Sequence, residues 1–180
     1  LDDLPCGALY RACYLYGDHS MKLILHVLLA CLLSLPVLAA ERLDDSASPL
    51  SEVQAQVFSE TGQLFSDSVN PQQAIMRFGQ VTYRLNTASY VGQQARIYYV
   101  IPALIPGLLD SHGVQVQWVS DGKLADGSAY AGERKLVWSG QIDEPWFTAH
   151  LNLTSIVNLN LLKSNSNNFG FESYFEIEAI

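Results

Sequence analysis

Cysteine is scarce in this sequence of 180 residues, and most of the chain has none. The three cysteines are Cys6, Cys13 and Cys31, so residues 41–180 contain no thiol. This excludes a disulfide, a Cys-ligated zinc ion and a thiolate nucleophile from that region. We therefore expect residues 41–180 to be stable through packing alone, and this length is sufficient for one domain with its own core.

Basic residues are also few. The chain has 10 Lys and Arg residues against 18 Asp and Glu residues, which gives a formal net charge of −8 at pH 7. Nucleic acids and anionic lipid headgroups are both bound by clustered positive charge, and no such cluster is present. We expect neither as a partner, and the moderate negative charge mainly favours solubility.

Long hydrophobic runs are limited to one, at residues 21–40. Lys22 supplies a positive charge, an apolar stretch follows from Leu23 to Leu38, and Val37 and Ala39 have the spacing that signal peptidase recognises. The apolar stretch has about 16 residues, which is shorter than the roughly 20 that a membrane-spanning helix needs. We predict a cleaved signal peptide, and therefore export to the periplasm, the cell surface or the medium, with no stable membrane span after cleavage.

Two features accompany this signal. Leu28-Leu29-Ala30-Cys31 matches a lipobox, so a lipoprotein anchored through Cys31 is a minor alternative; the apolar residues that continue past Cys31 argue against it. Residues 1–20 precede the start at Met21, and we expect them to be a non-native upstream extension that lies outside the fold.

The region after residue 70 consists of short segments in which apolar and polar residues alternate, separated by Gly, Pro, Asn and Asp. This pattern is typical of half-buried β-strands joined by turns. The predicted strands are Gln80–Asn86, Gln94–Ile101, Val114–Trp118, Lys135–Ile142 with a bulge at Ser139-Gly140, Thr148–Thr154, Ile156–Leu162 and Phe169–Ile180.

These strands predict an all-β fold, a single antiparallel β-sandwich over residues 71–180 with an immunoglobulin-like or jelly-roll topology. Residues 41–70 are expected to be an N-terminal arm, either short and helical or flexible. Ser51–Phe65 has apolar residues at helical spacing, but Val53, Ala55 and Val57 also fit one side of a strand.

No arrangement of residues predicts catalysis. The motif Gly-x-Ser-x-Gly is absent, His112 lies in a predicted turn, and His150 has the solvent-facing phase of a predicted strand. Asp121-Gly122 and Asp126-Gly127 bracket a loop with oxygen ligands but lack the spacing of an EF-hand. We predict no catalytic residue, no cofactor and no metal.

Binding residues are predicted at two aromatic positions. Trp118 and Trp138 share the phase of neighbouring apolar residues and are expected in the core. Trp146 follows a turn proline and Tyr130 lies in a Gly/Ala loop, so both are candidates for exposed rings that stack on a sugar or a partner. The acidic pair Asp143 and Glu144 precedes Trp146 and completes the candidate set.

These features indicate an exported, non-catalytic structural or interaction subunit of the bacterial envelope or cell surface, acting in assembly or adhesion. In size and β content the chain resembles exported fibre or pilus subunits, whose N-terminal arms complete a neighbour's sheet by strand addition. Val53, Ala55 and Val57 would serve as that arm here. The alternative is a secreted carbohydrate- or ligand-binding module, and a small hydrolase using Asp143, Glu144 or His150 is a third hypothesis.

Overall fold

The structure is a computed structural model, and it describes residues 40–49, 55–163 and 169–180. The predicted upstream extension, Cys31 and nearly all of the predicted signal peptide lie outside the described residues. Among the described residues, no helix is long and apolar enough to cross a membrane. The described strands are β1 (Glu41–Arg42), β2 (Gln56–Ser59), β3 (Gln73–Asn86), β4 (Gln94–Val100), β5 (Val114–Ser120), β6 (Gly127–Tyr130), β7 (Arg134–Gln141), β8 (Trp146–Asn158) and β9 (Tyr174–Ala179).

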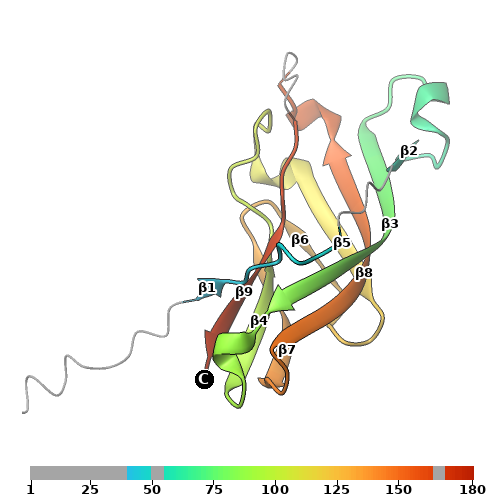
Figure 1. Cartoon of the computed structure of the whole chain (residues 1–180). Helices are drawn as coiled ribbons and strands as arrows, with labels where there is room; N and C mark the ends of the chain where they lie inside the picture. The colour runs from blue at the N-terminus through green and yellow to red at the C-terminus, as the bar shows by residue number, and fades with distance from the viewer. Residues whose placement is uncertain (1–39, 50–54, 164–168) are drawn as a thin grey trace, which may run out of the picture. The chain divides into compact units, whose positions relative to one another are not determined.

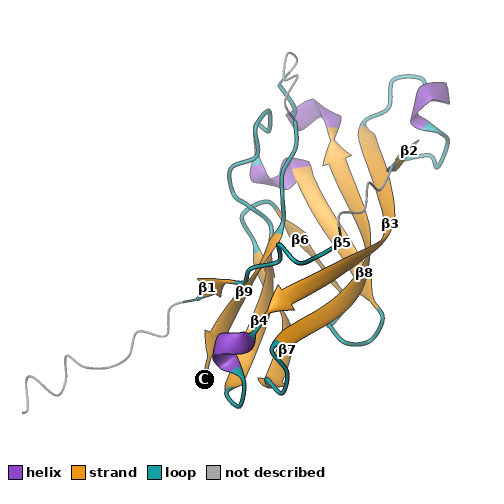
Figure 2. Cartoon of the chain, viewed as in Figure 1, coloured by secondary structure: helices purple, strands orange, loops and turns teal. Residues whose placement is uncertain are grey.

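Two antiparallel sheets are built from these strands (Figure 1). The four-stranded sheet has the order β1-β9-β4-β7, and the five-stranded sheet has the order β2-β3-β8-β5-β6. Short 3-10 turns at Phe65–Asp67, Ala88–Tyr90, Ser111–Gly113 and Leu159–Leu161 are the helical elements described (Figure 2). This arrangement confirms the predicted all-β sandwich.

The core follows from the alternation of side chains along the central strands. In β4, Ala95, Ile97 and Tyr99 are fully buried, whereas Arg96 points outward and Tyr98 is only half-buried. Side chains alternate between the faces of a strand, so every second residue of β4 faces the other sheet. The same rule buries Trp118 in β5, and its ring packs edge-on against Tyr99 at a centroid distance of 4.9 Å.

Strand β3 begins at Gln73, earlier than the predicted Gln80, and a bulge within the strand explains the difference. The register against β8 shifts between Arg77 and Gly79, and Gly79 has a positive φ of 69°. Ala74 and Met76 lie on the inner face before the bulge, and Tyr83 lies on it after the bulge. The inward-facing residues therefore have even numbers before the bulge and odd numbers after it. A sequence pattern of simple alternation does not continue across such a change, so it did not predict the first half of the strand.

Strand β7 has its bulge at Val137 and not at the predicted Ser139-Gly140. Ile97 pairs with Trp138 and Tyr98 pairs with Leu136, so Val137 is the extra residue. The bulge places Trp138 on the inner face, where it packs against Phe147 with ring centroids 5.3 Å apart. Leu136, predicted to share that face, is instead 50% exposed.

The segment predicted as one helical or flexible arm contains a strand. Gln56–Ser59 pairs antiparallel with β3, from Gln56 opposite Arg77 to Ser59 opposite Ala74. The helical alternative for Ser51–Phe65 is therefore wrong for the described residues 55–65, and the alternative of a strand holds for Val57. Val53 lies outside the described residues.

Residues 41–49, here named the bridging segment, connect the two sheets. Its first part pairs with β9: Arg42 lies opposite Glu176, and the Leu43 amide donates to the Phe175 carbonyl at 2.8 Å. Its second part lies on β3, where the Asp44 carbonyl accepts from the Asn86 amide at 2.8 Å. The Leu43 side chain is 3% exposed and is part of the core.

The outer face of β9 is acidic and pairs with arginine. Arg134 contacts Glu176 at 2.8 Å and Glu178 at 2.7 Å, and the Tyr98 hydroxyl donates to Glu178 at 2.9 Å. Hydrogen bonds from Arg134 and Tyr98 stabilise the charged form and lower the pKa of Glu178 below its ordinary value of 4.5. The ionised carboxylate therefore stabilises the folded state, and this contribution is lost as the pH falls below 4.5.

We expect Glu178→Gln to lower the free energy of unfolding at pH 7, and its difference from the wild type to shrink at lower pH. The wild-type carboxylate is itself protonated there, so the two proteins become alike. Urea unfolding at a series of pH values from 7 down to about 3 measures this difference. Glu144→Gln, at an exposed position, is the matched control and should change stability little at any pH. A constant deficit for Glu178→Gln across the series would contradict the assignment.

Candidate functional site

Three of the four predicted binding residues meet at the turn between β7 and β8. Asp143, Glu144 and Trp146 line a cleft of about 290 Å³, here named the β7–β8 cleft, together with Lys123 and Trp138. The fully buried Thr87, which directly follows β3, stabilises this turn. Its hydroxyl donates to the Glu144 carbonyl at 2.8 Å, and its amide donates to the Pro145 carbonyl at 2.9 Å.

The β7–β8 cleft combines carboxylates, cations and rings. Asp143 and Glu144 are exposed, and Trp146 is half-buried. The Arg84 guanidinium lies over the Trp146 ring at 4.6 Å, so one face of that ring is covered. The Lys123 ammonium lies over Phe147 at 4.3 Å. Such a mixture can hydrogen-bond several hydroxyl groups of one ligand, and a tryptophan ring can stack on a ligand ring.

Tyr130 does not belong to this cleft. It pairs with Gln115, which in turn pairs with Ile156, ten residues along β8 from Trp146. At about 3.3 Å per residue, the two aromatic positions are separated by roughly 33 Å. Tyr130 is half-buried, and its ring lies 5.4 Å from the His112 ring. The four predicted residues therefore do not form one site.

The two histidines among the described residues, His112 and His150, make local contacts. His150 Nδ1 lies 3.1 Å from the Thr82 hydroxyl across the β3–β8 pair, on the outer face that its phase predicted. His112 Nδ1 lies 2.9 Å from Asp110 Oδ1. The His112 amide and ring both donate to that carboxylate, which lowers the pKa of Asp110.

The aspartates of the 121–127 loop bind the chain itself. Asp126 accepts from the Ser120 amide at 2.7 Å, and Asp121 accepts from the Lys123 amide at 3.3 Å. These bonds shape the turn between β5 and β6. In the parts of the chain that the structure describes, no group of three His, Cys, Asp or Glu side chains is arranged to hold a metal ion.

A second cavity, larger than the β7–β8 cleft, involves residues that the sequence did not single out. It has a volume of about 640 Å³ and lies on the inner face of the five-stranded sheet, and we name it the inter-sheet cavity. The five-stranded sheet extends further than the four-stranded sheet at this end of the molecule. Strand β3 of the longer sheet runs back from Tyr83 to Gln73, whereas β9 of the shorter sheet begins only at Tyr174. Loops replace the four-stranded sheet beyond this point (Figure 2).

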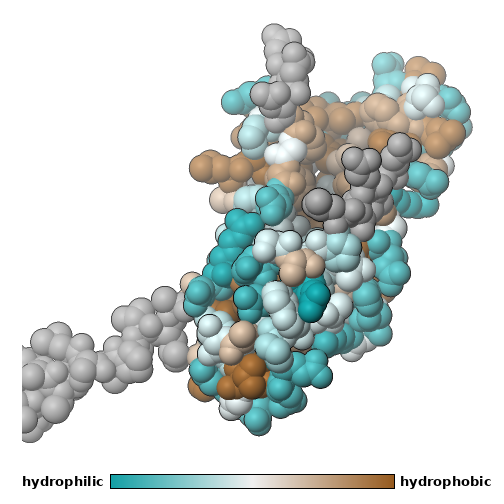
Figure 3. Space-filling model, in the orientation of Figure 1, coloured by the Kyte–Doolittle hydropathy of each residue, from teal (hydrophilic) through white to brown (hydrophobic). Residues whose placement is uncertain are grey.

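The walls of the inter-sheet cavity are mostly apolar. The lining residues come from β3, β4, β5, β8, the bridging segment and the segment before β9. The apolar ones include Met76, Val81, Val116, Leu153, Phe169 and Phe171. Apolar residues gather at this end of the molecule, while the opposite half is mostly polar (Figure 3). Leu64, Leu104 and Leu109 are each more than half exposed.

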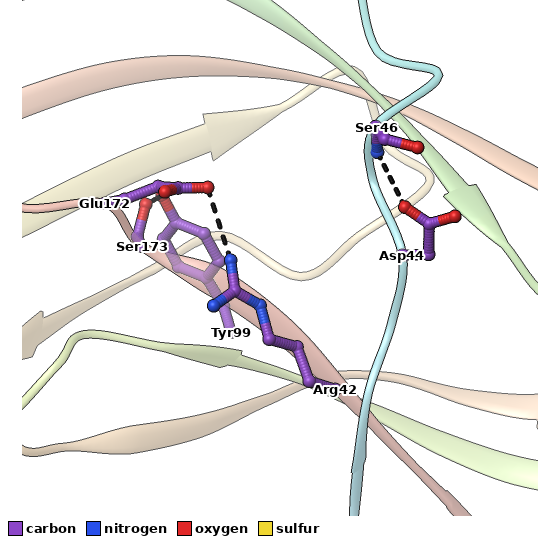
Figure 4. Close-up of polar contacts among 6 residues, drawn as sticks. All are labelled: Arg42, Asp44, Ser46, Tyr99, Glu172 and Ser173. Carbon is purple, nitrogen blue, oxygen red and sulfur yellow. Dashed lines mark hydrogen bonds and ion pairs between the residues drawn. The ribbon is translucent and has the colours of Figure 1, made fainter.

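A few hydroxyl groups interrupt these walls. The Tyr99 and Ser173 hydroxyls lie 2.6 Å apart (Figure 4), and the Tyr83 hydroxyl lies 3.5 Å from that of Tyr99. Burial raises the pKa of Tyr99 well above its ordinary value of 10. These tyrosines therefore serve the cavity as neutral hydrogen-bonding groups.

Ser155 is the exceptional member of the cavity wall. It is 2% exposed, and among the described residues its Oγ has no hydrogen-bond partner. The sequence carries a signal that could have indicated this position: Leu151, Leu153 and Val157 share one phase of β8, and Ser155 is the polar residue in that series. An inward-facing serine in an otherwise apolar row indicates a local polar requirement.

No family model, curated protein or solved structure matches the chain. The site is therefore interpreted from its own geometry.

We expect Tyr99→Phe to destabilise the protein by about 1 kcal/mol, because it leaves the half-buried Ser173 hydroxyl without its short hydrogen bond. Tyr83→Phe is the matched control, since its hydroxyl contact is at the limit of hydrogen-bond distance, and it should cost about 0.5 kcal/mol or less. Urea unfolding of both variants measures the two losses. Equal losses would show that the 2.6 Å contact has no special role.

Proposed function

We propose that this chain is an exported, non-catalytic interaction subunit that assembles with further copies by exchanging the bridging segment. The observation that supports this proposal is the way residues 41–49 complete both sheets. They add a short strand to β9 and hydrogen bonds to β3, and both of these strand edges would otherwise be open.

The contacts of the bridging segment are suited to exchange. The main-chain bonds to β9 and β3 are ones that any strand of the same direction can make, and the side-chain bonds come from residues of the same segment. One side chain, Leu43, is buried, and Arg42 binds Glu172 at 3.2 Å (Figure 4). A second copy would reproduce all of these contacts, so exchange costs no interaction. Reciprocal exchange gives a closed dimer, whereas head-to-tail exchange gives an open chain of subunits.

The other edge of the four-stranded sheet is less suited to a partner. There β7 is bulged at Val137, and the Ala125 amide donates to the Val137 carbonyl at 2.8 Å. Bulges and bonded carbonyls protect an edge from strand addition. Strand addition is therefore favoured at β9.

Paired cysteines can test exchange directly, because residues 41–180 contain none of their own. We expect Arg42→Cys in one population and Glu176→Cys in another to form a mixed disulfide-linked dimer when residues 40–180 of both are incubated together and oxidised. Directly opposite residues of an antiparallel pair have Cα atoms about 4.5–5.5 Å apart, within the range of a disulfide. The dimer is measured by non-reducing electrophoresis and mass spectrometry.

The matched control mixes Arg42→Cys with Ser139→Cys, an exposed position on β7, and should give only background linkage. The double variant Arg42→Cys/Glu176→Cys reports on both arrangements. A ladder of linked chains supports head-to-tail assembly. Intramolecular linkage alone, together with no mixed dimer above background, would show that the bridging segment serves only its own chain, and the proposal would then be rejected.

A second candidate function is carbohydrate binding in the β7–β8 cleft. It is favoured by the meeting of Trp146 with Asp143 and Glu144 beside Lys123. Sugar hydroxyls donate to carboxylates, and sugar rings stack on tryptophan.

If this second function is present, we expect a glycan array to identify a ligand whose affinity falls by about tenfold in Trp146→Ala, equivalent to about 1.4 kcal/mol. Tyr130→Ala is the matched aromatic control and should bind as the wild type does, because Tyr130 lies in β6, level with the end of β8 that is far from Trp146. An unchanged affinity in Trp146→Ala would exclude the cleft as the sugar site.

A further inference from the structure

The inter-sheet cavity has the dimensions and lining of a small-molecule site. Ligand pockets commonly measure about 300–1,000 Å³ and combine apolar walls with a few polar groups. This cavity measures about 640 Å³ and is lined by aliphatic and aromatic side chains, with the hydroxyls of Tyr83, Tyr99 and Ser173 on one side.

Ser155 provides the second, independent observation. Its side chain lies in the wall of the cavity, 2% exposed, and its hydroxyl has no partner among the described residues. A buried hydroxyl without a hydrogen bond is unfavourable, and a ligand group that reaches it would remove that cost. A serine hydroxyl can donate to a carbonyl oxygen or accept from a hydroxyl group.

The charges around the cavity restrict the ligand further. Of the described residues that line it, none is Lys, Arg or His, and its two ionisable acids are Asp45 and Glu172. A carboxylate or phosphate ligand would find no cation and would be repelled by these acids. Glu172 is already paired with Arg42 at 3.2 Å, which leaves little to attract a cationic ligand.

From this geometry we infer that the inter-sheet cavity binds an uncharged, mainly apolar small molecule that carries one hydroxyl or carbonyl group and places it at Ser155. The apolar body of the ligand lies against Met76, Leu153 and Phe171. Asp45, Ser48 and Pro49 of the bridging segment contribute to the cavity wall, and they do so when the segment stays with its own chain. Ligand binding therefore does not require exchange, and either property can hold without the other.

The test uses residues 40–180 and the neutral dye N-phenyl-1-naphthylamine, which fluoresces in apolar surroundings. We expect saturable binding of one dye per chain. Displacement by three molecules with the same apolar chain then reports on charge: 1-decanol, decanoate and decylammonium. We expect 1-decanol to displace the dye at a concentration lower by about tenfold or more than either charged molecule, because the cavity offers no counter-ion.

Two variants locate the site. Ser155→Leu fills the cavity and should weaken dye binding by about tenfold or more, while Ser139→Leu adds the same side chain at an exposed position of β7 and should bind as the wild type does. Ser155→Ala removes only the hydroxyl. It should weaken displacement by 1-decanol by about fivefold, the effect of one neutral hydrogen bond, and should leave the melting temperature of the ligand-free protein unchanged or higher.

Ser155→Ala keeps the proposal testable if Ser155→Leu fails to fold. Absence of saturable dye binding, equal binding in a folded Ser155→Leu variant, or displacement by decanoate as effective as that by 1-decanol would each overturn the inference. An unchanged response to 1-decanol in Ser155→Ala would overturn the role of the hydroxyl.

Discussion

Tyr99 is the residue on which the two-sheet arrangement depends. It is fully buried in β4, and its ring contacts one aromatic ring from each sheet. The centroid distances are 4.8 Å to Phe175 of its own sheet and 4.9 Å to Trp118 of the other sheet. Its hydroxyl binds Ser173, just before β9 begins. The ring therefore fixes the distance between the sheets, and the hydroxyl fixes where the four-stranded sheet ends.

The unequal lengths of the two sheets have two consequences. Beyond Tyr99 the inner face of the five-stranded sheet has no partner sheet, so loops cover it imperfectly and the inter-sheet cavity remains. Beside Tyr99 the strands β9 and β3 would leave open edges between the sheets, and the bridging segment closes them. The proposed assembly and the proposed ligand site thus arise from the same mismatch, and Asp45, Ser48 and Pro49 of the bridging segment belong to both.

The bridging segment and Ser155 are both places where the chain leaves an interaction open to another molecule. Main-chain bonds at β9 are independent of sequence, so a second copy can replace residues 41–43 without loss. Ser155 Oγ has no described partner, so a ligand can supply one. In contrast, three loop carboxylates already accept hydrogen bonds from nearby backbone amides, and they stabilise turns of the fold: Asp110, Asp121 and Asp126.

The sequence by itself determined the fold class, because period-two alternation with turn residues between segments permits few architectures. It also determined the inward phase of Trp118 in β5 and the outward phase of His150. Tertiary structure decided what local patterns cannot encode. The bulges at Gly79 and Val137 depend on the partner strand and change which side chains face inward. The separation of Tyr130 from Trp146, and the cavity at Ser155, depend on which strands lie together and where one sheet ends, and these are long-range contacts.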